Sequence, residues 1–237
     1  MRTRSLVCIL FLLAVCTVIV PPALSDPTDA AGWYAAGQSL TAAGNYTQAL
    51  QAYQQAIVLD PGNAEAWNGV ADVFNRANKY TSDPLATLKL ALDASNKSLA
   101  LNASSPSAWI NRGQILYNIG YYYQSQLKDQ ATANTYYQMQ LDAFSQAISI
   151  DPDNAEAWFN KGYALCGMGR CTEGVAAFQK VETLDPEYPY LQLNLAQAEK
   201  LAAGETPFYV QYAAEIVMAA IAIAAAALWY IAVRKKY

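Results

Sequence analysis

Residues 60–67 read DPGNAEAW, and residues 151–158 read DPDNAEAW. Seven of the eight positions are the same, although 91 positions separate the two stretches. Such similarity within one chain indicates an internal repeat, in which one supersecondary unit is copied and stacked. Weaker copies of the unit can therefore be identified by comparing residues at equivalent positions.

Four tryptophans mark four units along the chain: Trp33, Trp67, Trp109 and Trp158. Three of the units carry a glycine four positions later: Gly37, Gly113 and Gly162. Three units end in Leu or Ile followed by Asp-Pro, at Pro61, Pro152 and Pro186. The second unit ends at Leu101-Asn102 without the proline.

This pattern resembles the tetratricopeptide repeat (TPR), a helix-turn-helix unit of about 34 residues. Repeat one (30–63) matches the family at Trp33, Gly37, Ala49, Tyr53, Ala56 and Pro61. Repeat four (155–188) matches at Trp158, Gly162, Leu165, Phe178 and Pro186. Gly174 replaces the usual alanine there, so we expect one tight helix contact to be weaker.

The resemblance implies an all-α solenoid in which stacked helix pairs bury a common core. Repeats two (64–105) and three (106–154) are longer than the family unit, by inserts of 8 and 15 residues. In repeat one we expect helices over 31–43 and 46–58, and in repeat two a helix that starts at Pro84 with Asp83 as its N-cap. A last helix, 190–203, is expected to cap the solenoid.

Repeat three carries the tyrosine-rich insert 121–137, which would lengthen each of its two helices by about two turns. Two interpretations remain open. The lengthened hairpin packs on itself through its tyrosines, or it offers them as a docking surface, since tyrosine is large, rigid and amphipathic.

Both ends of the chain predict membrane targeting. Residues 1–25 combine two arginines, an apolar run and a small-residue cleavage site, as in a secretory signal peptide; an uncleaved signal anchor is the alternative. After a linker (204–207), residues 208–233 form an apolar stretch flanked by aromatic residues, and the basic tail 234–237 follows. We expect a single-pass cell-membrane protein with its N-terminal domain extracytoplasmic and its tail cytoplasmic. A buried core helix or a cleaved sorting signal is the alternative for 208–233.

Composition excludes several function classes. The chain has no histidine and a net charge of −4. It offers no nucleophile beside a base, no phosphate-binding glycine loop and no metal-ligand set. We therefore expect no enzyme, no cofactor and no metal, and the acidic surface makes nucleic acid an unfavourable partner.

Cysteines and sequons matter because the domain is expected outside the membrane. Cys166 and Cys171 flank a predicted turn, and a disulfide between them is favoured over two free thiols or half of a metal site. Three triplets match the N-glycosylation pattern, at Asn45, Asn96 and Asn102.

The resemblance also implies a concave groove lined by the first helix of each repeat. Carried over by position, the groove residues are Tyr34, Gln38, Thr41, Asn68, Asp72, Asn75, Ile110, Asn111, Gln114, Tyr117, Phe159, Asn160 and Tyr163. Side-chain amides such as Asn111 and Asn160 both donate and accept hydrogen bonds, as a bound peptide backbone requires. The implied function is a non-enzymatic scaffold that binds an unidentified protein or peptide. The alternative is a module that captures a peptide or glycan for a neighbouring membrane transporter or enzyme.

Overall fold

The structure, a computed structural model, describes residues 27–204. This part of the chain is helical, with nine α-helices, one 3₁₀ turn and no strand. The helices are α1 (Ala30–Ala42), α2 (Tyr46–Leu59), α3 (Ala64–Ala77), α4 (Pro84–Leu101), α5 (Pro106–Ser125), α6 (Gln130–Ile150), α7 (Ala155–Gly167), α8 (Cys171–Leu184) and α9 (Leu191–Ala202). The 3₁₀ turn η1 (Asn78–Tyr80) lies between α3 and α4.

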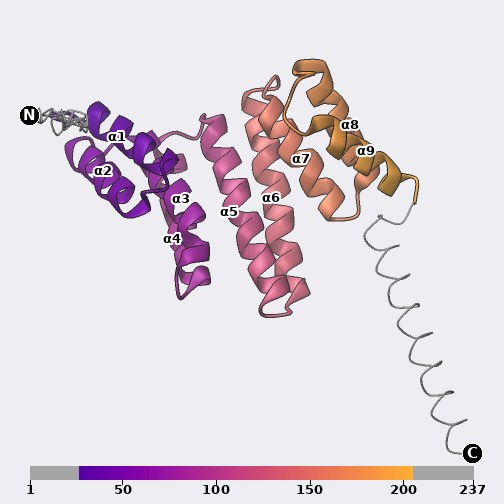
Figure 1. The fold of residues 1–237 in the computed structure, drawn as a ribbon, viewed down its shortest axis with the longest axis horizontal. Coiled ribbons are helices and arrows are strands. Elements are labelled where there is room, and N and C mark those ends of the chain that lie inside the picture. The colour runs from indigo at the N-terminus through magenta and orange to yellow at the C-terminus, as the bar shows by residue number, and fades with distance from the viewer. Residues whose placement is uncertain (1–26, 205–237) are drawn as a thin grey trace, which may run out of the picture.

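The helices follow one another in a row from α1 to α9 (Figure 1). Each helix packs against its neighbours in the chain, and the odd-numbered helices also contact one another from α1 through α9. Within residues 27–204 the even-numbered helices do not contact each other. The odd helices thus form one continuous layer. Because a single hairpin cannot bury its apolar face, each pair depends on the next for stability.

The two similar stretches of sequence each form a turn that leads into a helix of this layer. Asn63 caps α3 by accepting a hydrogen bond at Oδ1 from the Ala66 N–H (2.8 Å). Asn154 caps α7 in the same way, with the Ala157 N–H at 3.0 Å. Satisfying an otherwise free N–H of the first turn fixes where each helix begins.

Two of the repeat tryptophans hold the preceding turn against their own helix. The Trp158 indole N–H donates to the Pro152 carbonyl at 2.8 Å, and that of Trp109 donates to the Ala103 carbonyl at 2.9 Å. At Trp67 the Lys97 ammonium instead lies over the indole ring, 4.2 Å from the ring centroid, in a cation–π contact. In repeats three and four the Trp therefore joins the loop between repeats to the helix that follows it.

The glycines of the repeat make room for aromatic rings from the partner helix. A Cβ on Gly113 would lie 2.4 Å from Cε1 of Phe144, whose ring is 1% exposed. In repeat one the ring of Tyr53 lies against Gly37 of its own repeat and against Gly69 of the next. Such distances are far inside van der Waals contact, so only glycine allows the helices to approach this closely.

Repeat three forms the lengthened hairpin predicted for it. Its helices have 20 and 21 residues, against 13 and 14 for α7 and α8. The hairpin packs on itself: Tyr123 and Tyr136 stack with ring centroids 5.5 Å apart, and Tyr117 and Tyr137 lie 6.1 Å apart. In repeat two the predicted helix start is confirmed, because Asp83 Oδ1 accepts from the Ala86 N–H and Pro84 begins α4.

The turn between α7 and α8 differs from the predictions. Cys166 and Cys171 are free thiols, not the expected disulfide. The Cys166 sulfur lies 4.0 Å from the Cys171 carbonyl oxygen, and the Cys171 sulfur lies 3.7 Å from the Cys166 carbonyl oxygen. The expectation for Gly174 was also wrong, because a Cβ there would lie 2.6 Å from the Cys166 sulfur and 2.9 Å from the Gly162 carbonyl. Glycine thus permits a closer contact instead of weakening one.

Each predicted repeat range holds one pair of helices, and α9 lies in the range expected for the cap. The predicted signal peptide (1–25), transmembrane stretch (208–233) and basic tail (234–237) lie outside the described residues, as does most of the linker. Across residues 27–204, no helix combines the length and the apolar character that crossing a bilayer requires.

Candidate functional site

The layer of odd-numbered helices carries two separate cavities. The first, here called the N-terminal groove, has a volume of about 390 Å³ and is bounded by α1, α3, α5 and the start of α7. The second, the C-terminal cavity, has a volume of about 910 Å³ and lies between the α5–α6 hairpin and α7, α8 and α9. Both cavities are lined in part by α5 and α7, the first helices of repeats three and four.

The N-terminal groove gathers most of the predicted residues. It is lined by Tyr34, Gln38, Thr41, Asn68, Asp72, Ile110, Asn111 and Gln114. At its α1 end, the Gln38 amide donates to the Tyr34 hydroxyl at 2.9 Å, and burial raises the pKa of Tyr34 above its ordinary value. The wall contributed by α1 is therefore aromatic, uncharged and held in place by its own hydrogen bond.

Asn111 is a buried polar residue of this groove. It is 7% exposed, and its amide nitrogen donates to Asn68 twice, to Oδ1 at 2.8 Å and to the backbone carbonyl at 3.2 Å. Its Oδ1 is buried and has no hydrogen-bond partner among the described residues. A buried acceptor without a partner costs on the order of 1–3 kcal/mol.

The charges around the groove are mainly acidic. Asp72 accepts both of its hydrogen bonds from the Arg76 Nε at 2.8 Å, and this contact raises the pKa of Arg76. Glu65 and Glu156 have no such basic partner, although Glu65 accepts a hydrogen bond from the Ser105 hydroxyl at 3.3 Å. Desolvation by neighbouring groups raises the pKa of Glu156. The groove therefore offers acceptors and negative charge to a ligand.

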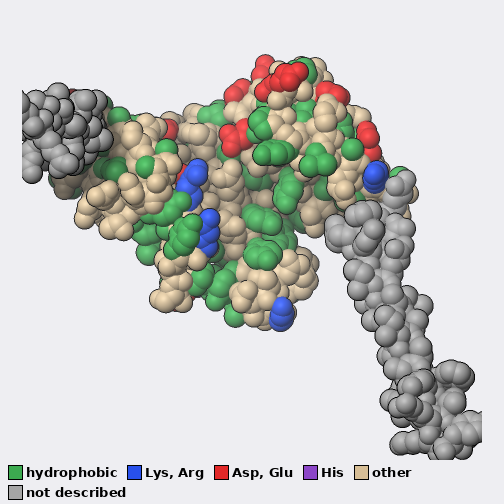
Figure 2. Space-filling view, viewed as in Figure 1, with side chains coloured by type: hydrophobic (Ala, Val, Ile, Leu, Met, Phe, Trp, Pro, Cys, Tyr) green, Lys and Arg blue, Asp and Glu red, His purple; other side chains and the backbone are tan. Residues whose placement is uncertain are grey.

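The acidic character extends beyond the groove itself. Figure 2 shows Asp and Glu side chains along the edge of the molecule where α7 and α8 lie. The negative electrostatic potential of these side chains favours the approach of a basic partner and disfavours an acidic one.

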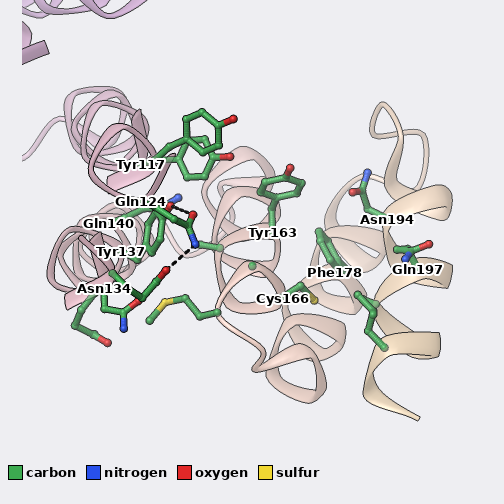
Figure 3. A pocket seen from close by; sticks show the side chains of 18 residues that line it. Tyr117, Gln124, Asn134, Tyr137, Gln140, Tyr163, Cys166, Phe178, Asn194 and Gln197 are labelled. Carbon is green, nitrogen blue, oxygen red and sulfur yellow. Dashed lines mark hydrogen bonds between the residues drawn. The ribbon is translucent and has the colours of Figure 1, made fainter. Parts of the chain in front are cut away.

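The C-terminal cavity contains the predicted residues Tyr117 and Tyr163 (Figure 3). Both rings come from helices of the inner layer, α5 and α7. They lie beside a wall from α6 that the sequence had not indicated, because the family groove is built from the first helix of each repeat alone.

Three predicted groove residues line neither cavity. Asn75 is buried and joins two helices, because its Oδ1 accepts from the Asn118 amide at 2.7 Å. Phe159 packs in the core against Phe178 and Tyr188, with centroids 5.4 and 4.9 Å away. Asn160 is half-buried and borders neither cavity. The residues carried over by position therefore include one on α3 and two on α7 that do not line a cavity.

Sequence reasoning missed Glu65 and Glu156 as groove residues. Both belong to the two similar stretches, two positions before the tryptophan, so the repeat itself places an acidic side chain at the first turn of α3 and of α7. It also missed Arg76, whose only indication was its spacing of four from Asp72. The three sequon asparagines, Asn45, Asn96 and Asn102, are exposed.

Comparison with known proteins is consistent with this architecture. Two tetratricopeptide-repeat family models match the chain, over residues 34–98 and 143–173. No curated protein sequence matches it.

Solved structures share the fold at low identity. A thermophilic TPR protein of Thermus thermophilus, TTC0263, is 17% identical, with a TM-score of 0.60 over 74% of this chain and 83% of that one. The pilF protein of Pseudomonas aeruginosa is 20% identical, with a TM-score of 0.58 over 71% and 67%. A double mutant of MamA from RS-1 is 19% identical, with a TM-score of 0.54 over 76% and 92%.

The quoted stretches, the stacked helix pairs, the glycine–aromatic contacts and both family matches agree. Two tetratricopeptide-repeat family models match parts of the chain, and residues 27–204 share the fold of solved TPR structures.

Proposed function

We propose that the chain is a non-enzymatic interaction scaffold that binds an extended, basic peptide segment of a partner protein in the N-terminal groove. The TPR fold supports protein–protein interaction in general. The observation that carries the narrower proposal is the pair of groove carboxylates, Glu65 and Glu156, with which no Lys or Arg among residues 27–204 forms a salt bridge.

The groove selects for a donor-rich ligand. The exposed Gln38 amide and the half-buried Gln114 amide offer donors and acceptors to a peptide backbone along this surface. Glu65 and Glu156 lie at the rim, and no described Lys or Arg pairs with them. A Lys or Arg of the ligand would pair with them, whereas an acidic ligand would be repelled.

We further propose that the domain is presented on the outer face of the cell membrane. The sequence supports this through the signal-peptide pattern of 1–25 and the apolar stretch 208–233 with its basic tail. Because the predicted linker of residues 204–207 is short, the domain would lie close to the bilayer. Partners would then be other membrane proteins or proteins held at that surface.

Peptide selection tests the groove. A phage-displayed random peptide library would be selected on the immobilised full chain in detergent. We expect the enriched peptides to carry Lys or Arg and to bind the Glu65→Gln/Glu156→Gln double variant roughly tenfold more weakly, a loss of about 1.4 kcal/mol.

The matched control is the Glu187→Gln/Glu199→Gln double variant, which changes the net charge equally at exposed positions outside both cavities. It should bind the selected peptides as the wild type does. Selection that yields no peptides, or peptides that bind both double variants equally, would contradict the proposed site.

A further inference from the structure

The C-terminal cavity exists because repeat three is longer than repeat four. The last turns of α5 and the first turns of α6 extend past the ends of α7 and α8 (Figure 1). The extension forms one wall, and α7 with α9 forms the other. A volume of about 910 Å³ falls within the range of small-molecule sites, roughly 300–1,000 Å³.

The lining of this cavity is polar but uncharged. It contains four tyrosines and seven side-chain amides, and none of its described residues is Asp, Glu, Lys or Arg. The N-terminal groove, by contrast, is bordered by four charged side chains. A ligand of the C-terminal cavity therefore finds no ion-pair partner in this lining and must be held by hydrogen bonds and apolar contact.

Side-chain amides along the hairpin wall form a chain of hydrogen bonds, here called the relay, which fixes their orientation. The Tyr137 hydroxyl donates to Gln124 Oε1 at 2.9 Å, Gln124 donates to Gln130 Oε1 at 3.0 Å, and Gln130 donates to Asn134 Oδ1 at 2.7 Å. The relay ends at the Asn134 amide nitrogen, which is left as a donor at the cavity wall (Figure 3). Fixed amides of this kind bind with little loss of side-chain entropy.

Gln140 points to a ligand independently of that relay. It is 4% exposed and lines the cavity. Its amide is not among the hydrogen-bonded side chains of residues 27–204. A side-chain amide can both donate and accept, so it suits a ligand group that does the same.

Two tyrosine rings offer open faces in the same space. Tyr121 on α5 is 54% exposed, and Tyr163 on α7 is 52% exposed. The Tyr117 ring stacks on Tyr121 with centroids 6.2 Å apart, which holds that ring in position. A tyrosine ring combines an apolar face with a polar tip and suits a ligand that has both characters.

We propose that the C-terminal cavity binds a neutral oligosaccharide. A pyranose ring has an apolar face for stacking on tyrosine and hydroxyl groups that both donate and accept, which matches the side-chain amides. A proline-rich peptide could also use the aromatic faces. It supplies few donors for the amide oxygens, however, so the amide-rich lining favours the sugar.

Isothermal titration of the full chain tests this proposal. The detergent should be lauryldimethylamine oxide, because sugar-based detergents would compete. Maltohexaose, cellohexaose and N-acetylchitohexaose are the probes. We expect at least one to bind with a Kd between about 1 μM and 1 mM, and Tyr163→Ala and Gln140→Leu each to weaken it roughly tenfold.

Tyr190→Ala is the matched control, since Tyr190 is exposed and lies outside the cavity. It should leave binding unchanged, and the exposed position of Tyr163 means that Tyr163→Ala should fold normally. Three results would overturn the proposal: no heat with any of the three sugars, binding that Tyr163→Ala does not weaken, or binding of decaproline in place of the sugars. Peptide binding in the N-terminal groove is measured separately, so its failure would leave this result interpretable.

Discussion

The glycine–aromatic contact inside repeat three predicts that Gly→Ala has opposite effects there and at a glycine without such a contact. Gly113→Ala adds a methyl group whose ideal position is 2.4–2.8 Å from three atoms of the Phe144 ring. Gly167→Ala adds the same group at the end of α7, where nothing lies within 4 Å. Both glycines belong to the first helix of their repeat.

The magnitude follows from two opposing terms. Replacing glycine by alanine within a helix stabilises it by about 0.5–1 kcal/mol, because the unfolded chain loses freedom. Overpacking a core costs about 1–3 kcal/mol. The Phe144 ring is buried and cannot swing aside freely. We therefore expect Gly113→Ala to lower the free energy of unfolding by roughly 0.5–2 kcal/mol, whereas Gly167→Ala raises it by up to about 1 kcal/mol.

Urea unfolding followed by far-UV circular dichroism measures both effects. Phe144→Leu supplies a second test, because it removes ring atoms that face Gly113. In that background Gly113→Ala should be nearly neutral, which is a coupling of about 0.5–3 kcal/mol between contacting residues. If Gly113→Ala stabilises the chain as much as Gly167→Ala does, the steric account of the repeated glycine is wrong.

Three further predictions concern caps, pH and thiols. Asp83→Ala should destabilise the N-terminus of α4 by about 1 kcal/mol, seen as faster amide hydrogen exchange there than in α8, which serves as an internal control. Glu156→Gln should raise the melting temperature at pH 7, because desolvation by neighbouring groups raises the pKa of this carboxyl and its ionised form is disfavoured in the folded state. The effect should disappear as pH falls below the ordinary value of 4.5, and an equal gain at low pH would contradict it. Burial raises the pKa of Cys166 to about 12, so iodoacetamide at pH 8 should alkylate it much more slowly than after unfolding. Mass spectrometry of tryptic peptides resolves it from Cys171, because Arg170 separates them.

The architecture could be predicted from the sequence because the features of the repeat depend on interactions between residues that are close in the chain. The Asn63 and Asn154 caps and the Asp83-Pro84 helix start each depend on a few neighbouring residues. Such features can be recognised without knowledge of the rest of the fold. The length of the α5–α6 hairpin followed directly from the size of its insert.

The grooves were harder to predict because they depend on contacts between repeats. Asn75 occupies a position expected to face the groove, but its amide instead joins α3 to α5. The C-terminal cavity needs a wall from α6, which exists only because the hairpin overhangs α7. The pairing of Asn111 with Asn68 spans 43 positions, and no local pattern indicates it.

Photo-cross-linking in native membranes tests the central claim, that a partner occupies the N-terminal groove. A benzoylphenylalanine would replace Gln38, which is exposed in the groove, and in a second protein Gln48, which is exposed on α2 outside both cavities. We predict a stoichiometric product from position 38 that is absent from position 48 and is reduced by the Glu65→Gln/Glu156→Gln double variant. Equal products from both positions, or none from position 38, would contradict binding in the groove.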